Sequence, residues 1–327
     1  MSADKPLVVV LGASGFIGSG ITRELARRSV RLRAVARRPT PVPAGHIADV
    51  EVVTTDLTEE GMLAKVIAGA DVIVHLVAYT DAGWRVAEGD TSAERVNVGL
   101  VSDIVDAVRA ENRAGAPPVV LFAGTKTQVG LTEHERIDGT EPDLPRSPYG
   151  RQKLAAENVL KDATAEGVLR GVSLRLPTVY GHGPESTTDD RGVVSAMARR
   201  AMAGEQLTMW HDGSVRRDLV YIDDVTTAFT AALDHADALM GKHWLIGTGV
   251  SVPLGEVFAE IASIVAEQTG KPPVAVVSIE PPDNADPNDL RGVEIDATTF
   301  RGITDWSPRV SLREGLHRTI TALVGKS

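Results

Sequence analysis

Short apolar runs alternate with amphipathic stretches through the first half of the chain. The runs are rich in Val, Leu and Ile and almost uninterrupted, which is typical of strands buried on both faces of a parallel sheet. The strands predicted in this way are Leu7–Leu11, Leu32–Ala36, Val50–Thr54, Val72–Leu76, Val119–Phe122 and Val172–Leu176. One helical pattern between them places apolar residues at Val96, Leu100, Ile104 and Val108. This alternation predicts a doubly wound parallel α/β domain.

The pattern loosens after Leu176. Two polar segments interrupted by glycine and proline, GHGPESTTDDRG and EPPDNADPNDL, predict loops. The elements predicted between them are a helix near Val193–Ala203, a hairpin through Leu207–Ile222, and helices near Val225–His235 and Leu254–Thr269. Because 327 residues allow about two domains, we expect a smaller mixed α/β domain over one edge of the sheet.

Composition excludes several classes of function. The formal net charge of −10 argues against nucleic acid or an anionic membrane as a partner, because both need a clustered positive surface. The lack of cysteine excludes disulfides, zinc–thiolate sites, iron–sulfur clusters and cysteine nucleophiles. No apolar run approaches the roughly 18 residues of a membrane span, and Leu7–Leu11 is too short for a signal-peptide core. We therefore expect a soluble cytoplasmic protein. No histidine–carboxylate spacing indicates a metal, so no metal site is expected.

Three glycines follow the first predicted strand in the segment GASGFIG. Gly12, Gly15 and Gly18 stand where a dinucleotide needs a tight turn, a close approach to the backbone, and close helix–strand packing. The following helix would offer free N–H groups to the phosphates. A bare turn is the alternative, but the place between first strand and first helix favours a dinucleotide. We therefore assign residues 1–177 and 223–250 to a dinucleotide-binding domain, and residues 178–222 and 251–327 mainly to substrate binding.

The second predicted strand ends in RAVARRP. An NAD site usually has an acidic residue here, whereas a 2′-phosphate favours arginine. Arg37 and Arg38 occupy this place, so the sequence predicts NADPH, with a solvated basic turn as the alternative. Asp56, after the third predicted strand, is equally well interpreted as an acceptor for the adenine amine or as a helix N-cap.

A tyrosine and a lysine stand four residues apart in SPYGRQK. Ser147 is a suitable N-cap and Pro148 a good first helical residue, so Tyr149 and Lys153 should share one helix face. A nearby ammonium, an oxidised nicotinamide and the helix dipole would all favour the phenolate of Tyr149, making it a usable acid and base. The pair is weak support alone, because such a spacing also arises by chance.

A hydroxyl in the segment LFAGTKTQVG strengthens the pair. Thr125 follows the fifth predicted strand and would lie at the carboxyl edge of the sheet, where ligands bind in such folds. There it can hold a substrate carbonyl oxygen beside the tyrosine. An ordinary threonine at a strand end is the alternative.

With these motifs, the chain resembles the extended short-chain dehydrogenases/reductases, the NAD-dependent epimerase/dehydratase family with a Rossmann-type fold. The resemblance runs from about Leu7 to Leu323. It rests on GASGFIG, on Thr125 five residues before Gly130, on the Tyr149/Lys153 pair, and on the segments RVNVGL, RLPTVYG and RRDLVYIDDV. Within the family it is most similar to the 4-ketoreductases that reduce dTDP-4-keto-6-deoxyhexoses with NADPH in antibiotic deoxysugar biosynthesis.

The resemblance implies a catalytic triad of Thr125, Tyr149 and Lys153, with Lys153 also binding the nicotinamide ribose. The expected cofactor-binding residues are Gly12, Ser14, Gly15, Phe16, Ile17, Gly18, Arg37, Arg38, Asp56, Leu57, Leu76, Val77, Ala78, Asn97, Tyr149, Lys153, Pro177 and Val179. The expected substrate-binding residues are Trp84, Arg85, Thr127, Gln128, Thr178, His182, His211 and Arg217. Arg217 would contact the sugar-nucleotide diphosphate; a surface arginine paired with Asp218 or Asp212 is the alternative. The family also pairs the helices near Val96–Glu111 and Pro148–Glu166, so a homodimer is expected.

Departures from the family pattern favour one reaction. Lys126 and Thr127 replace the acid pair of the dehydratases, and the epimerase-reductases that act at carbons 3 and 5 need a cysteine. Arg37 replaces the acidic residue usual in 4-epimerases, and Thr178 replaces their frequent asparagine. These departures favour reduction of a dTDP-4-keto-6-deoxyhexose. The alternatives are a 4-epimerase and a non-catalytic NADP-sensing regulator; such regulators generally lack the Tyr/Lys pair.

Several further residues invite a functional interpretation. His75 lies in a predicted buried strand and is expected to be a packed, hydrogen-bonded histidine. His182 and His211 are loop residues that would contact sugar only if the cleft includes them. Trp84 and Arg85 follow the fourth predicted strand and would form a wall of the sugar site.

Overall fold

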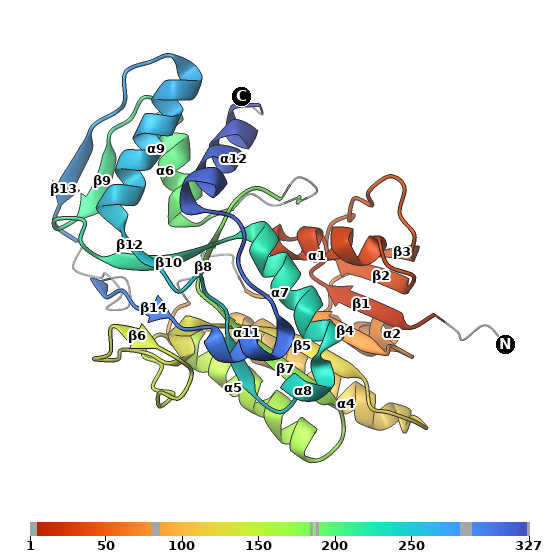
Figure 1. The fold of residues 1–327 in the computed structure, drawn as a ribbon. Coiled ribbons are helices and arrows are strands. Elements are labelled where there is room, and N and C mark those ends of the chain that lie inside the picture. The colour runs from red at the N-terminus through yellow and green to blue at the C-terminus, as the bar shows by residue number, and fades with distance from the viewer. Residues whose placement is uncertain (1–4, 80–85, 184–185, 188–189, 282–289, 326–327) are drawn as a thin grey trace.

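A computed structural model describes residues 5–79, 86–183, 186–187, 190–281 and 290–325. Its centre is a seven-stranded parallel sheet with the order β11-β7-β5-β4-β1-β2-β3 (Figure 1). The strands are β1 Leu7–Leu11, β2 Arg31–Ala36, β3 Asp49–Thr54, β4 Val72–His75, β5 Val119–Thr125, β7 Arg170–Leu176 and β11 His243–Leu245. The strand order reverses between β1 and β4, which is the topological switch point of a Rossmann-type sheet. The predicted fold class is confirmed.

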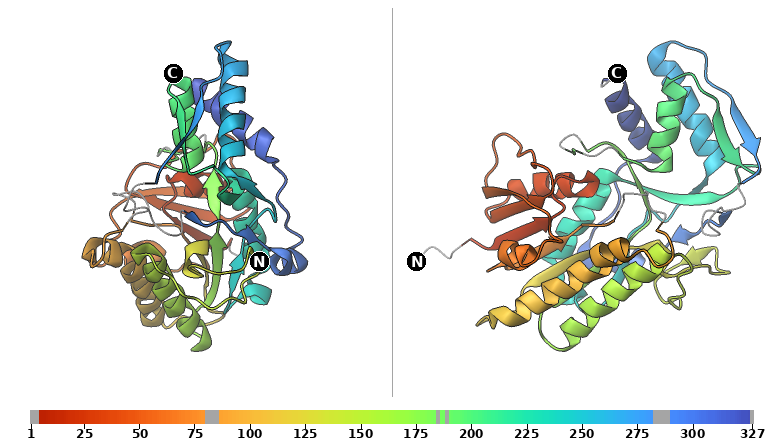
Figure 2. Two further views of the ribbon diagram at one scale, coloured as in Figure 1. Left: turned by 90° about the vertical axis from the view of Figure 1, so that its left-hand side faces the viewer. Right: turned by 180° about the vertical axis from the view of Figure 1, so that it is seen from behind.

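Helices cover both faces of this sheet. Successive residues of β1 point to opposite faces, so Val8 and Val10 pack in one core while Val9 and Leu11 pack in the other. The first core is covered by α1 Phe16–Ala26, α7 Ile222–Asp234, α8 Ala236–Leu239 and α11 Thr298–Thr304. The second core is covered by α2 Met62–Ile67, α4 Leu100–Glu111 and α5 Pro148–Ala165. Helices α4 and α5 run side by side, as a dimer through these two helices would require (Figure 2).

Two of the predicted elements differ in detail. The edge strand β3 is largely exposed, although its apolar pattern predicts burial on both faces. Among the described strands it pairs with β2 alone, as the end strand of the sheet, and most of its residues are exposed. The predicted helix through Val96 begins with α3 Thr91–Glu94 and a π-helical stretch, Arg95–Gly99, before the regular α4. Such π-helical insertions occur frequently at functional sites.

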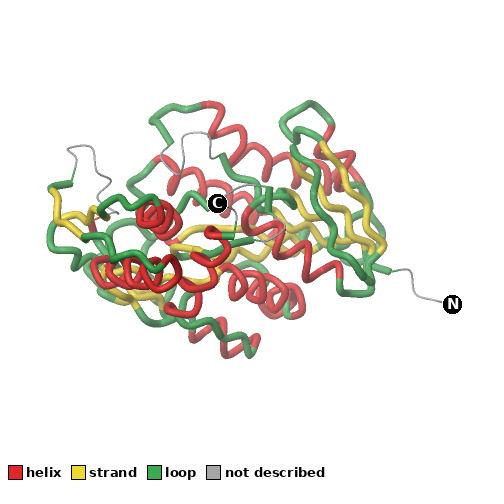
Figure 3. The backbone as a smooth tube through the Cα atoms, turned by 90° about the horizontal axis from the view of Figure 1, so that it is seen from above, coloured by secondary structure: helices red, strands yellow, loops and turns green. Residues whose placement is uncertain are grey.

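A second lobe packs beside the large sheet and has its own core. Its helices are α6 Val193–Met202, α9 Leu254–Thr269 and α12 Leu312–Val324. Its strands are β8 Thr178–Tyr180, β9 Leu207–Trp210, β10 Arg216–Tyr221, β12 Ser251–Pro253 and β13 Val276–Ile279. Seen from above, β9 and β13 lie toward one end of the molecule and β2 and β3 toward the other, whereas β8 follows β7 of the large sheet after one residue (Figure 3).

The hairpin predicted through Leu207–Ile222 is wrong. Strand β9 pairs in parallel with β13, whereas β10 pairs with β12 and β8. Both strands are present, but each takes a partner distant in sequence. A sequence pattern of neighbouring strands cannot distinguish this arrangement from a hairpin.

The chain passes more than once between the two lobes. Strand β11 forms an edge of the large sheet, and Ala297, Phe300 and Trp306 pack in its first core. A short pair, β6 Arg136–Ile137 with β14 Glu294–Ile295, also joins distant parts of the chain. Within the described part of the chain, none of the helices combines the length and apolar character needed to cross a membrane.

Candidate active site

The glycine turn, residues Gly12–Gly18, lies at the switch point between β1 and β4. Gly12 has φ 91°, a conformation that glycine adopts without strain, and its N–H donates to the carbonyl of Val35 (2.8 Å). A Cβ at Gly12 would lie 3.4 Å from the backbone carbon of Leu76, which follows β4. A Cβ at Gly18 would overlap the Gly12 carbonyl oxygen. The structure therefore explains two of the predicted glycine roles, the tight turn and close helix packing.

The first turn of α1 has the features that suit a bound anion. Its N-cap is the extended Gly15, and no described side chain caps the helix. The N–H groups at this terminus and the helix dipole favour a phosphate. Phe16 and Ile17 pack against the core of the second lobe, and the Thr187 N–H donates to the Ser14 carbonyl (3.0 Å). The glycine turn therefore contacts both lobes, and the residues present fit a dinucleotide.

The two arginines after β2 are exposed at the same edge of the sheet. Arg38 donates to the carbonyl of Thr187 (2.8 Å). Asp56 accepts from the backbone N–H (2.9 Å) and hydroxyl (2.7 Å) of Thr58, and these bonds, together with the charge of Arg37, lower its pKa. Asp56 therefore caps a turn rather than a helix, since α2 begins only at Met62. Recognition of a 2′-phosphate by the arginines stays a prediction.

Further predicted cofactor residues occupy two settings. Because the sheet is parallel, the segments after its strands meet at one edge. The predicted residues at this edge, besides those above, are Leu76, Val77, Ala78, Pro177 and Val179. Leu57, in contrast, is buried in the second core of the sheet.

Thr125 is the last residue of β5 and caps the short 3₁₀ helix of residues 126–128. Its Oγ1 accepts from the Thr127 N–H (3.3 Å) and lies 3.2 Å from the Thr127 hydroxyl. Gln128 is fully buried: its Oε1 accepts from the Thr125 N–H (2.8 Å) and its Nε2 donates to Glu157 (2.7 Å). The predicted contact of Gln128 with substrate is therefore wrong, because both ends of the amide bind inside the protein.

Helix α5 carries the tyrosine and lysine as the sequence predicts. Ser147 is the N-cap and accepts from the Gly150 N–H (3.1 Å), with Pro148 in the first position. The helix start packs against the threonine segment, since a Cβ at Gly150 would lie 2.9 Å from the Thr127 carbonyl. Tyr149 therefore stands next to the segment that holds Thr125.

Lys153 and Tyr149 are perturbed by burial. The Lys153 Nζ lies 4.2 Å from the centre of the Phe122 ring on β5. Burial lowers the pKa of Lys153 to about 7, against the charge of Glu157, which raises it. Burial raises the pKa of the Tyr149 phenol, opposite in direction to the predicted activation. Burial therefore keeps the Tyr149 phenol protonated and makes it a weaker acid than a free phenol.

A buried ionic cluster lies beneath this helix. Glu157, one turn after Lys153, accepts from Arg175 through Nη2 (2.7 Å) and Nε (3.1 Å), and from Lys161 (2.7 Å). Arg175 also donates two bonds to Asp143, and both Arg175 and Glu157 are fully buried. Burial raises the pKa of Glu157, but bonds from His243, Arg175 and Lys161 hold it well below its usual value.

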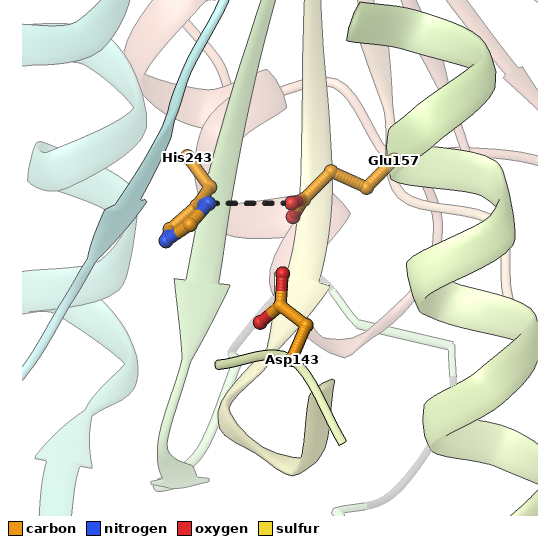
Figure 4. Close-up of side chains that lie close together, drawn as sticks. All are labelled: Asp143, Glu157 and His243. Atoms are coloured by element: carbon orange, nitrogen blue, oxygen red, sulfur yellow. Dashed lines mark ion pairs between the residues drawn. The ribbon is translucent and has the colours of Figure 1, made fainter. Parts of the chain in front are cut away.

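Three members of this cluster, Asp143, Glu157 and His243, are residue types that commonly bind metal ions. Figure 4 shows the Asp143 carboxylate pointing toward the Glu157 carboxylate and the His243 ring, with ligand atoms within 4.8 Å of one another. Arg175, however, bonds to both carboxylates and Lys161 to one of them. Protein cations therefore already balance the charge that a metal would neutralise, and the geometry is that of an ion-pair network.

Asn97 lies in the π-helical stretch and is buried. Its Oδ1 accepts from the Tyr79 N–H (2.9 Å), and its Nδ2 donates to Gln152 on α5 (2.8 Å). Its amide thus connects the segment after β4 with the helix that carries Tyr149. A contact of Asn97 with the cofactor stays a prediction.

Arg217 on β10 is buried, so the surface ion pair considered as its alternative is wrong. Its Nη1 donates to the carbonyls of Arg216 (2.9 Å) and Arg291 (3.0 Å). The Asp218 carboxylate instead accepts from Thr248. The diphosphate contact of Arg217 stays a prediction.

Three further predicted substrate residues lie in the second lobe or in the loops beside it. Thr178 begins β8 and is half-buried, as is His182 in the following loop. His211 follows β9 with φ 49° and lies 3.7 Å from the Glu280 carboxylate. The structure thus gives His211 a local partner. Trp84 and Arg85 lie outside the described residues.

His75 corrects a further expectation. It ends β4, stacks on Phe122 with ring centroids 5.9 Å apart, and is buried as predicted. Neither ring nitrogen has a hydrogen-bond partner among the described residues, so the predicted hydrogen bond is wrong. Burial and, as the smaller cause, the charge of Lys153 lower the pKa of His75 to about 3.

We expect His75→Leu to stabilise the protein, most strongly in acid. Removing two unsatisfied polar atoms should raise the free energy of unfolding by about 1 kcal/mol at pH 8. Between about pH 3 and 6.5 the unfolded chain binds a proton at His75 that the folded chain does not, so stability rises with pH across this window. The gain should therefore be larger at pH 5, as measured by urea unfolding at both pH values. The exposed His46→Gln is the control, and an equal gain at pH 5 and 8 would contradict the argument.

The ionic cluster is what the sequence reasoning missed. Glu157 continues the spacing of Tyr149 and Lys153 by one more helical turn, and Arg175 interrupts an otherwise apolar strand. A charged residue in a strand buried on both faces needs a partner. These two signals could have indicated the ion pair; Asp143, in a loop, carried no such signal.

Comparison with known proteins shows the family to which this chain is similar. A profile of the NAD dependent epimerase/dehydratase family matches residues 8–247. The chain is 28% identical over 353 residues to the dTDP-L-rhamnose 4-epimerase of Burkholderia thailandensis, covering 96% of this chain and 93% of the relative. It is 27% identical over 323 residues to the dTDP-6-deoxy-L-talose 4-dehydrogenase (NAD(P)(+)) of Kitasatospora kifunensis, covering 96% and 95%. The solved structure of MoeE5 in complex with UDP-glucuronic acid and NAD is similar with a TM-score of 0.80 and 27% identity, covering 98% and 99%.

Proposed function

Because the chain belongs to the NAD dependent epimerase/dehydratase family, we propose that it reduces the 4-keto group of a dTDP-4-keto-6-deoxyhexose with NADPH. The observation that carries this choice is the exposed pair Arg37 and Arg38 after β2. A site for NAD usually has an acidic residue at this position, whereas arginine suits the 2′-phosphate of NADPH. NADPH binds as an exchangeable reductant, which suits net reduction. The relative from Kitasatospora supports the proposal, since a 4-dehydrogenase catalyses the reverse type of reaction.

The site residues divide the work of reduction. NADPH supplies the hydride when bound, and the glycine turn with the first turn of α1 would hold its pyrophosphate. The hydroxyls of Thr125 and Tyr149 hold the carbonyl oxygen, and Tyr149 donates the proton that completes the alcohol. Lys153 stabilises the resulting phenolate and binds the nicotinamide ribose. Because burial raises the pKa of Tyr149, the phenol carries its proton at neutral pH, and transfer of that proton depends on stabilisation of the phenolate by Lys153.

Oxidation of NADPH in the presence of dTDP-4-keto-6-deoxyglucose tests this function. We expect stoichiometric formation of NADP⁺ and of a 4-hydroxy sugar. The absence of turnover, with NADPH bound, would contradict the proposal and favour the NADP-sensing regulator.

The second candidate is a nucleotide-sugar 4-epimerase. The name of the Burkholderia relative favours it, and epimerisation at carbon 4 can use the same three residues. The two reactions differ in the fate of the cofactor: an epimerase returns the hydride to the sugar. Interconversion of two dTDP-hexoses without net oxidation of NADPH, by protein that copurifies with NAD, would select the epimerase.

Cofactor preference provides a separate test. We expect the double variant Arg37→Ala/Arg38→Ala to raise the Kd of NADPH by about 10- to 100-fold, because charge-assisted bonds to a phosphate contribute about 1.5–3 kcal/mol. The Kd of NADH should change little, because NADH has no 2′-phosphate. Arg27→Ala, an exposed arginine at the end of α1, is the control. Equal weakening of both cofactors would contradict recognition of the 2′-phosphate.

A further inference from the structure

A chain of hydrogen bonds runs from Thr125 into the interior beneath α5. The Thr125 N–H donates to Gln128 Oε1 (2.8 Å), and Gln128 Nε2 donates to Glu157 Oε2 (2.7 Å). Gln128 and Glu157 are each fully buried. The chain therefore connects the end of β5 to the helix that carries Tyr149 and Lys153.

The far end of this chain is held rigidly. Arg175 donates twice to the Glu157 carboxylate, from Nε to Oε2 (3.1 Å) and from Nη2 to Oε1 (2.7 Å). Arg175 is fixed in turn by two bonds to Asp143 (2.6 and 2.8 Å). An ionised carboxylate only accepts hydrogen bonds, so Glu157 determines which end of the Gln128 amide points toward it.

This arrangement fixes the other end of the amide as well. With its NH₂ group on Glu157, Gln128 presents its oxygen to the Thr125 N–H, as the acceptor that this backbone group needs. A Cβ at the preceding Gly124 would lie 2.8 Å from Gln128 Oε1, so the amide packs closely under the strand end. The position of Thr125 thus depends on a carboxylate two helical turns after Tyr149.

We propose that Gln128 and Glu157 are positioning residues that hold Thr125 in register with Tyr149 and Lys153 for proton and hydride transfer. This inference rests on the proposed function. Burying an ion pair such as Glu157 with Arg175 is weak support for stability, because desolvation offsets much of the attraction. Precise positioning of the Thr125 hydroxyl is a sufficient reason to bury this ion pair, because a small misplacement of a reacting group has a large effect on rate.

Exchanging the two side chains tests the bond itself. In Gln128→Glu, a carboxyl faces Glu157, so it can replace the amide only while protonated, and burial next to a carboxylate raises its pKa. In the double variant Gln128→Glu/Glu157→Gln, the new Gln at position 157 donates to the carboxylate at position 128. Its amide oxygen remains available to Arg175 Nη2 and Lys161, and the acceptor for the Thr125 N–H is retained, whereas Arg175 Nε loses its acceptor on this side chain.

We expect kcat of Gln128→Glu to approach that of the wild type near pH 5.5 and to fall about tenfold or more by pH 8, with KM within about threefold. The double variant should recover kcat at pH 8 and lose the pH step. Hydrogen exchange at the Thr125 amide, a readout independent of turnover, should be faster in Gln128→Glu at pH 8 and slow again in the double variant.

Ser173→Ala is the matched control, because it removes a bond of equal length to the same oxygen of Glu157 without touching the link to Thr125. It should lower Tm but keep kcat. Three outcomes would each overturn the proposal. The first is a loss of kcat in Ser173→Ala equal to that in Gln128→Glu, and the second is a wild-type pH profile in Gln128→Glu. The third is a double variant whose kcat and Thr125 amide exchange at pH 8 are no closer to wild type than those of Gln128→Glu. Wild-type protein without turnover would instead contradict the proposed function, and the exchange of the Thr125 amide would still test the bond.

Discussion

Replacing Tyr149 by phenylalanine is expected to lower kcat by about 10²–10⁴-fold, the usual contribution of a general acid. The hydroxyl is the proton donor in the proposed reduction, and water would replace it poorly at a site where burial already perturbs titrating groups. The affinity for NADPH should change little, because the glycine turn and the arginines after β2 remain intact. Steady-state kinetics with a dTDP-4-keto-6-deoxyhexose and titration of NADPH fluorescence measure the two quantities separately.

Tyr180→Phe is the matched control for this substitution. Tyr180 is buried in the second lobe, where its hydroxyl donates to the Leu312 carbonyl (3.3 Å). Its loss should reduce stability by about 1 kcal/mol and leave kcat unchanged. Retention of wild-type kcat by Tyr149→Phe would remove Tyr149 from the mechanism, whatever the cofactor.

The strands of the large sheet could be predicted because burial on both faces leaves a local signal. The apolar run Leu7–Leu11 is β1 itself, and five other strands of the sheet are found at or near the predicted positions, whereas the edge strand β11 was not predicted. The exposure of β3 could not be predicted, since its place at the edge depends on the order of all the strands. The pairing of β9 with β13 is likewise decided by elements that are far apart in the chain.

The same distinction applies to the candidate site. The glycine turn, Thr125, and the pair Tyr149 and Lys153 are local motifs whose spacing already expresses their geometry. Gln128 was misinterpreted because its distance from Thr125 indicates proximity but not the direction of its side chain. That direction depends on Glu157, which α5 brings close from 29 residues away. Short-range motifs thus predict which residues do the chemistry, and the contacts that orient them need the three-dimensional structure.

The second large effect is expected from Gly18→Ala in the glycine turn. A Cβ at this position would overlap the carbonyl oxygen of Gly12 and approach its carbonyl carbon to 2.8 Å. These are backbone atoms in a turn fixed by the bond from Gly12 N–H to Val35, so no flexible side chain can move aside. Either α1 shifts away from β1 or the turn opens, and in both cases the N–H groups that would hold the pyrophosphate are displaced.

We therefore expect Gly18→Ala to reduce the free energy of unfolding by about 3 kcal/mol, at the upper end of overpacking effects, and to weaken NADPH binding by at least about 100-fold. Urea unfolding and fluorescence titration measure the two effects. Gly302→Ala in α11 is the control with the opposite sign, because a Cβ there meets nothing within 4 Å. It should stabilise the protein by about 0.5–1 kcal/mol through the better helix propensity of alanine. If Gly18→Ala were as stable as Gly302→Ala and bound NADPH normally, the packing of α1 against the glycine turn could not be what shapes the cofactor site.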